Sequence, residues 1–332
     1  MPLLALTLVA CGQTTATPAP SPSTPSSAAL IAPLAESPAT VQNCGETVSY
    51  ASVPERAVTV DVNITEMMLA LGLQDRMAGI GGVSSKGDIL PEYQPAFAEV
   101  PSISEKYPTL EVLLGANPDF VFAGWNYGFS EEKGLTPAVL NERGIATYIL
   151  TESCIRKGAR PPITIQDTFT DLRNLGAIFR VEDRAAALIA GYEQDLAAIQ
   201  STLPKRDTPL RVFVYDSGEA TPFTAASEAI PTNLISLAGG ANIINDIKDS
   251  WVTVGWETVI ERNPEMIVIV DYGTPNAEGK QRYLLNNPAL ANVDAIKNKR
   301  FVVLPYAAAT PGPRNAAAVR TLAEAFFPEE FQ

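Results

Sequence analysis

Aromatic and polar side chains occur where the expected strands end, and their chemistry suits recognition of a polar ligand. Tyr and Trp give rigid apolar contact with one polar tip, and Arg314 can hold an anionic or oxygen-rich group through its planar guanidinium. Ligand sites in α/β proteins lie at such strand ends. The predicted ligand-binding residues are Lys86, Trp125, Asn126, Tyr127, Tyr215, Asp216, Tyr272, Tyr306 and Arg314. Trp125, Tyr272 and Arg314 are the strongest of these predictions.

Several acids belong to the same loops, among them Glu152, Asp216, Glu219 and Asp271. A carboxylate-rich site suits a cationic or neutral metal chelate better than a highly anionic one. Direct ligation of a metal by these acids is an alternative, but the aromatic and hydroxyl neighbours favour an intact complex. We therefore assign no metal ligands and no cofactor.

The composition excludes several function classes. The 332 residues contain no histidine, which rules out imidazole metal sites and Ser-His-Asp triads. A net charge of −13 argues against nucleic acid and anionic membrane surfaces as partners. We expect a protein that is not an enzyme, although the pair Asp216 and Glu219 leaves an exported hydrolase open as an alternative.

Two segments, 109–125 and 255–271, share one pattern of helix, Pro turn and buried strand. In each, a Glu lies seven residues before a Pro, Asn precedes that Pro and an acid follows it. The two glutamates, Glu111 and Glu257, fall in the first helical turn, where the helix dipole favours a carboxylate. A unit used twice predicts two similar lobes.

Helices alternate with short apolar strands, which indicates α/β units around largely parallel sheets. A chain of this length with 46% hydrophobic residues can bury two cores. We expect an N-terminal lobe over 44–180, a bridging helix over 181–204 and a C-terminal lobe over 205–332. The expected strands are 57–61, 77–80, 120–123, 147–150, 211–215 and 301–304, and the long helices are 165–179, 182–203 and 315–326.

The N-terminus has the features of a targeting segment. Residues 1–11 contain a short apolar run, Leu3 to Ala10, followed by Cys11. This segment resembles a bacterial lipoprotein signal with Cys11 as the lipidated residue. Residues 12–43 are rich in Thr, Ser, Pro and Ala and predict a disordered tether. The other two cysteines, Cys44 and Cys154, predict a disulfide in an exported protein, with two buried thiols as the alternative.

Three motifs together resemble a known family. Pro54-Glu-Arg-Ala-Val-Thr-Val, then the segment Glu66 to Arg76, then Glu111 with Pro118-Asp119 look like the substrate-binding proteins of bacterial iron–siderophore, haem and vitamin B12 importers. The resemblance covers roughly residues 48–327. It implies two Rossmann-like α/β lobes joined by one long α-helix, with the ligand in a cleft between the lobes. It also implies that Glu111 and Glu257 dock onto arginines of a membrane permease.

These observations together predict a monomeric, lipid-anchored receptor outside the cytoplasm, in the periplasm or on the cell surface. It would capture a ferric siderophore or similar chelate and deliver it to the permease of an ABC importer. Cobalamin or haem is the alternative ligand within the family, and the absence of histidine disfavours haem. A scaffold lipoprotein without a transport role is the alternative from another class.

Overall fold

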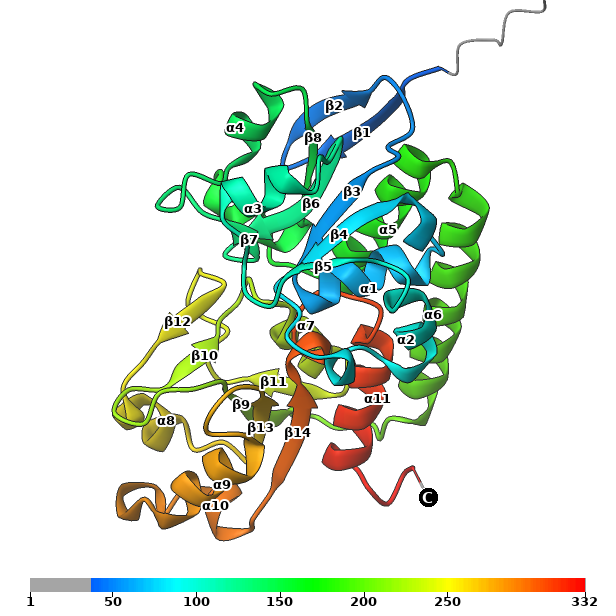
Figure 1. Ribbon diagram of the computed structural model, residues 1–332. Helices are drawn as coiled ribbons and strands as arrows, with labels where there is room; N and C mark the ends of the chain where they lie inside the picture. Colours follow the sequence, from blue (N-terminus) through cyan, green and yellow to red (C-terminus); the bar gives the residue numbers. More distant parts are fainter. Residues whose placement is uncertain (1–36, 332) are drawn as a thin grey trace, which may run out of the picture. The chain divides into compact units, whose positions relative to one another are not determined.

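Two parallel β-sheets form the centre of the fold in a computed structural model, which describes residues 37–331 (Figure 1). The first sheet has the strand order β5-β4-β3-β6-β7, with β8 paired to β6, and the second has the order β11-β9-β13-β14. The strands of the first sheet are β3 Ala57–Val60, β4 Met77–Gly81, β5 Ser102–Ser104, β6 Phe120–Trp125, β7 Gly128–Phe129 and β8 Ala146–Ile149. Those of the second are β9 Leu210–Tyr215, β11 Gly240–Asn242, β13 Met266–Asp271 and β14 Phe301–Pro305.

The sheet centres are buried on both faces. All four residues of β3 are buried, as are the first five residues of both β6 and β13. Strands covered on both faces read as continuous apolar runs rather than as an alternation. The shorter α-helices are α1 Val62–Ala70, α2 Gln94–Phe97, α3 Leu110–Gly115, α4 Pro137–Asn141, α7 Ile230–Leu237, α8 Trp256–Arg262, α9 Ala277–Asn286, α10 Asp294–Lys297 and α11 Asn315–Phe326.

The predicted repeat is present as α3 with β6 and as α8 with β13. After α3, Asn117 takes a left-handed backbone (φ 49°), and its carbonyl accepts a hydrogen bond from Nε of Arg56 at 2.7 Å. The acid that follows the Pro, Asp119, accepts from the backbone N–H of Arg56 at 2.9 Å. One arginine before β3 therefore fixes the turn that leads into β6.

The second lobe uses the same contacts. Asn263 also has a positive φ of 42°, and its carbonyl accepts from Nε of Arg211 at 2.9 Å. Glu265 accepts from the backbone N–H of Arg211 at 3.0 Å. The repetition of this arginine-to-turn bond supports the interpretation of the chain as two similar halves.

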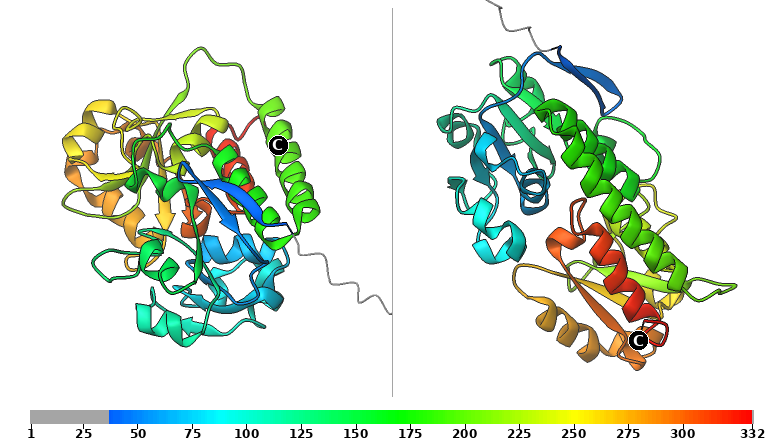
Figure 2. Two further views of the ribbon diagram at one scale, coloured as in Figure 1. Left: turned by 90° about the horizontal axis from the view of Figure 1, so that it is seen from above. Right: turned by 90° about the vertical axis from the view of Figure 1, so that its right-hand side faces the viewer.

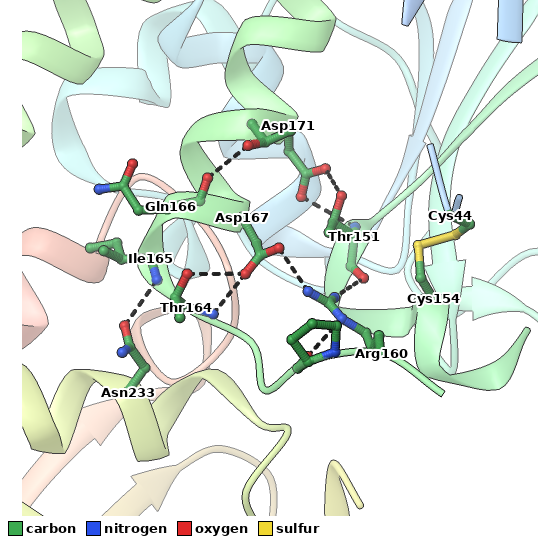
Figure 3. Close-up of polar contacts among 12 residues, drawn as sticks. Cys44, Thr151, Cys154, Arg160, Thr164, Ile165, Gln166, Asp167, Asp171 and Asn233 are labelled. Atoms are coloured by element: carbon green, nitrogen blue, oxygen red, sulfur yellow. Dashed lines mark hydrogen bonds and ion pairs between the residues drawn. A yellow bond between two sulfur atoms is a disulfide. The ribbon is translucent and has the colours of Figure 1, made fainter. Parts of the chain in front are cut away.

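A helical pair, α5 Ile165–Phe179 and α6 Glu182–Thr202, connects the two sheets. The right-hand view of Figure 2 shows these green helices running past both the blue-to-cyan and the orange-to-red parts of the chain. At the start of α5, the N–H of Ile165 donates to Oδ1 of Asn233 in α7 at 2.9 Å (Figure 3). The predicted fold class, two α/β lobes with a long helix between them, is confirmed.

The predicted tether extends too far. Residues 39–43 form β1 (Ala39–Asn43), which pairs with β2 (Glu46–Tyr50) in an antiparallel hairpin. The hairpin is held to β8, because the Asn43 side chain bonds both the N–H and the carbonyl of Ile149, at 2.9 and 2.7 Å. Alternating buried positions at 39, 41 and 43 give this short segment its strand period. Cys11 and the rest of the predicted tether, up to residue 36, lie outside the described residues.

Further segments differ from the sequence-based expectation. Helix α1 begins at Val62, whose N–H donates to Oδ1 of Asp61 at 2.6 Å. The next residue, Asn63, is fully buried, and its amide donates to the carbonyl of Pro311 at 2.7 Å. Helix α9 and the small antiparallel pair β10 (Phe223–Ala225) with β12 (Trp251–Thr253) were not predicted. Within residues 37–331, no helix combines the length and apolarity that crossing a bilayer requires.

Candidate ligand-binding cleft

A cleft of about 830 Å³ lies where strands of both sheets end. Residues that directly follow β3, β6, β9 and β13 contribute to its lining, so both halves of the chain supply one shared site. Its aromatic lining residues are Tyr107, Trp125, Tyr127, Phe223, Trp251, Tyr272 and Tyr306. The rings of Tyr272 and Tyr306 contact each other with centroids 5.4 Å apart, and Phe223 stacks on Trp251 at 5.9 Å.

Most of the predicted ligand-binding residues meet in this cleft. They are Trp125, Asn126, Tyr127, Asp216, Tyr272, Tyr306 and Arg314. The structure brings them together from both sheets, while their roles toward a ligand stay a prediction.

Two predicted residues are not part of the lining. Tyr215 is only 1% exposed, because as the last residue of β9 its ring turns into the core against Trp256 and Tyr283. Lys86 is exposed in the short 3₁₀ helix Lys86–Asp88, and its neighbours Ser84 and Gly87 line the cleft instead.

Asp61 is a buried acid of the cleft that the sequence analysis missed as a site residue. Its carboxylate, 2% exposed, accepts hydrogen bonds from the hydroxyl groups of Tyr306, at 3.0 Å, and of Tyr107. Burial raises the pKa of Asp61, while these donors and the N–H of Val62 oppose the rise. An Asp directly after an apolar strand and before a helix was the available signal. Because Tyr306 belongs to the second half of the chain, this bond joins the two halves.

Glu152 makes a second contact between the halves. It follows β8 in the 3₁₀ helix Thr151–Arg156 and is 1% exposed. Oε2 accepts from the Tyr127 hydroxyl at 2.8 Å, and Oε1 accepts from the N–H of Ile230 in α7 at 2.8 Å. Burial raises the pKa of Glu152 to about 7, against the effect of these two hydrogen bonds.

Asp216 holds the ring of Tyr272 in place. The Tyr272 hydroxyl donates to Oδ1 of Asp216 at 2.6 Å, and Ser217 Oγ donates to the same oxygen at 2.8 Å. The ammonium of Lys280 lies 4.3 Å from the centre of the Tyr272 ring and donates to the carbonyl of Val270 at 2.6 Å. Burial raises the pKa of Asp216. Tyr272 itself is 41% exposed, so a rigidly held aromatic face remains open.

Arg314 lines the cleft, but its charge is already paired. Nε and Nη2 both donate to the carboxylate of Glu66 in α1, and Nη2 also donates to the carbonyl of Asp88. The side chain of Glu66 is fully buried, and such a charge needs a close partner. Glu66 therefore already balances the charge of Arg314, and a contact of Arg314 with a ligand stays a prediction.

More acidic than basic residues line the cleft. Five acids line it, namely Asp61, Asp88, Glu152, Asp216 and Asp271, against the two arginines Arg156 and Arg314. Arg156 is exposed. Among residues 37–331, no three Asp, Glu, Cys or His side chains group in a way that could hold a metal ion.

Trp125 offers an unused donor. Its indole Nε1 is buried without a hydrogen-bond partner in the described part of the chain, while its backbone N–H donates to Ser153 Oγ at 3.0 Å. Buried donors are nearly always paired in folded proteins. An unpaired one beside a cleft is therefore suited to a ligand acceptor.

The two predicted docking acids lie outside the cleft lining. Glu111 is exposed in the first turn of α3, whose N-cap Thr109 accepts from the N–H of Val112 at 3.3 Å. Glu257 is exposed in the first turn of α8. Docking of a permease at these acids stays a prediction.

We expect the free energy of unfolding to fall as the pH rises from about 5 to 7. Burial raises the pKa of both Glu152 and Asp171 to about 7, and Asp171 is fully buried beside Thr151 (Figure 3). Unfolded carboxyl groups lose their protons near pH 4, so between the two pKa values the native state holds more protons and stability falls with pH. The loss is on the order of 2–3 kcal/mol per group.

Urea unfolding at pH 5.5, 6.5 and 7.5 measures this slope. Glu152→Gln should make the slope shallower, because an amide does not titrate and only the contribution of Asp171 remains. Glu278→Gln, at an exposed position, should leave the slope unchanged. A stability that stays constant or rises over this range contradicts the prediction.

Comparison with known proteins places the chain in a family. Residues 58–308 match the family model described as periplasmic binding protein. A curated relative is the vitamin B12-binding protein of Pectobacterium atrosepticum, 25% identical over 228 residues that cover 67% of this chain and 74% of the relative.

Solved structures share the fold. A periplasmic binding protein from Veillonella parvula superposes with a TM-score of 0.75 at 32% identity, covering 86% of this chain and 96% of the other. An ABC-type Fe3+-hydroxamate transport system structure from Saccharomonospora viridis gives a TM-score of 0.74 at 23% identity, covering 86% and 98%. The chain belongs to the periplasmic binding protein family.

Proposed function

We propose that this protein captures a ferric siderophore, or a closely related metal chelate, outside the cytoplasm and delivers it to the permease of an ABC importer. The observation that carries the proposal is the lining of the cleft between the two halves. It combines seven aromatic residues with five acids, and the arginine that reaches it from the second half is already paired. Such a surface suits a bulky chelate without negative charge, of which an uncharged ferric hydroxamate is an example.

The dimensions of the cleft agree with this ligand class. A volume of about 830 Å³ falls within the range of about 300–1,000 Å³ that is typical of small-molecule sites. The open face of Tyr272 can stack on the chelate, and the unpaired Nε1 of Trp125 can donate to one of its oxygens. The fold similarity to the Saccharomonospora viridis hydroxamate system is consistent with the proposal.

Cobalamin is the second candidate. It is favoured by the name of the Pectobacterium relative, a vitamin B12-binding protein. Haem fits less well, because its two propionates meet a cleft with more acidic than basic lining residues, and the sequence has no histidine to ligate the iron. We also propose that Cys11 is lipidated and that residues up to about 36 tether a monomer to the bacterial membrane.

Fluorescence titration tests the ligand class. Trp125 and Trp251 line the cleft, so a bound ferric chelate should quench their emission. We expect saturable quenching by a ferric tris-hydroxamate, and an affinity about ten- to a hundredfold lower in Tyr272→Ala because an aromatic anchor is lost.

Lys86→Ala is the matched control, since Lys86 does not line the cleft, and its affinity should equal that of the wild type. Binding of cobalamin alone would favour the second candidate. Absence of binding to hydroxamate, catecholate, haem and cobalamin would contradict the proposed class.

A further inference from the structure

The cleft arginine Arg314 is neutralised by a residue that does not line the cleft. The pair links α1 of the first half to the start of α11 in the second, 248 positions apart in the sequence. Its geometry is bidentate, with Nε and Nη2 of Arg314 on the two oxygens of Glu66. The side chain of Arg314 is 11% exposed and that of Glu66 is 0% exposed, so solvent screens this pair little.

The surroundings fix Glu66 in this role. Its Oε1 also accepts from the N–H of Leu90 at 2.8 Å, so the carboxylate is held on both sides. Nearby, Asn63 donates to the carbonyl of Pro311, which ties α1 to the segment that carries Arg314. The carboxylate therefore cannot move away and leave Arg314 free for a ligand.

We propose that Glu66 sets the charge class of the ligand. By cancelling Arg314, it removes one of the two cations that line the cleft and leaves the five acids there in excess. An anionic chelate then meets net repulsion, whereas an uncharged or cationic chelate does not. Glu66 is thus a positioning residue that determines specificity without touching the ligand. The inference rests on the proposed function, because it concerns the same cleft.

The test compares the affinities of two ferric chelates that differ in net charge. Affinities of an uncharged ferric tris-hydroxamate and a trianionic ferric tris-catecholate are measured for the wild type, Glu66→Gln and the double variant Glu66→Gln with Arg314→Gln. Glutamine keeps the shape and an acceptor oxygen but removes the charge, which frees the guanidinium. We expect the ratio of catecholate to hydroxamate affinity to rise about tenfold or more in Glu66→Gln and to return to the wild-type ratio in the double variant.

A matched control uses another Glu–Arg pair. Glu278 and Arg282 form an exposed pair away from the cleft lining, and Glu278→Gln should leave the affinity ratio unchanged. A ratio in Glu66→Gln within about twofold of the wild type overturns the inference alone. Failure of the wild type to bind either chelate overturns the proposed function and this inference with it.

The double variant also gives an independent answer if Glu66→Gln does not fold. If Glu66 neutralises Arg314 in the wild type, the ion pair attracts no anion. Removing both charges should then leave the ratio of catecholate to hydroxamate affinity at its wild-type value. A tenfold fall of the ratio in the double variant would show that Arg314 attracts anions in the wild type, which contradicts the role given to Glu66.

Discussion

Loss of the Cys44–Cys154 disulfide is expected to lower the free energy of unfolding by about 4 kcal/mol. The bond closes a loop with a sequence separation of 110 residues. In the chain-entropy model, opening a loop of this length costs about 4–5 kcal/mol, through the greater freedom of the unfolded chain. The measurement is guanidinium unfolding of the variant Cys44→Ser with Cys154→Ser, compared with the wild type under oxidising conditions.

A reductant provides the control. It should destabilise the wild type toward the level of the double Ser variant and leave the variant itself unchanged. The bonds of Asn43 to Ile149 stay in place in the variant, so the hairpin β1–β2 should remain docked and the loss should not come from a missing element. A difference below about 1 kcal/mol would show that the unfolded chain gains little freedom when the bond is absent.

The bond also fastens a part of the ligand site. Cys154, bonded to Cys44 in Figure 3, lies in the 3₁₀ helix Thr151–Arg156. The same 3₁₀ helix supplies Glu152 and Ser153 to the cleft. The hairpin turn that carries Cys44 is thereby joined to one wall of the cleft.

Local sequence signals predicted the repeated framework. Helices α5 and α11 begin and end at the predicted residues, and α6 ends within one residue of its predicted end. These elements have apolar residues at helical spacing and clear ends, and such signals act over a few residues. The repeated unit was recognisable for the same reason, since its Glu, Asn and Pro lie within one short segment.

The cleft chemistry depended on contacts that no local pattern contains. The sequence gives Arg314 no sign that its partner is Glu66, because the two residues are distant along the chain. Tyr215 was placed at a strand end correctly, but its ring faces the core. The face of the sheet on which the last side chain of a strand lies depends on the packing of the whole lobe. A shift of the strand register by one residue moves that side chain to the opposite face.

The sequence analysis did not predict the hairpin β1–β2, because the tether-like composition of the preceding residues was a stronger signal than the short alternation of buried positions in β1. The preceding residues are rich in Thr, Ser, Pro and Ala, and the sequence continues into Ala39–Asn43 without a clear break. The alternation of buried positions in β1 spans only five residues. What makes it a strand is its pairing with β2 and its side-chain contacts to β8, and both are tertiary.

Replacing both docking acids, Glu111→Ala with Glu257→Ala, is expected to reduce ligand uptake by whole cells more than tenfold while leaving ligand affinity unchanged. Both acids are exposed in the first turn of a helix, where the dipole favours a carboxylate and leaves it free to receive an arginine fork from a partner. Truncating one partner of an interfacial charge pair that is buried and hydrogen-bonded in the complex costs about 2–5 kcal/mol. Neither acid lines the cleft, so the affinity for the ligand should not change.

A control with the same change in net charge separates docking from general electrostatics. Glu105 and Glu261 are also exposed, and Glu261 lies one turn further along the same helix as Glu257. The variant Glu105→Ala with Glu261→Ala should transport as the wild type does. Equal losses in both double variants would mean that overall charge, and not two specific contacts, governs the encounter with the permease. Normal uptake without Glu111 and Glu257 would instead agree with a lipoprotein that has no transport role, since only a docking protein needs one exposed acid in each half.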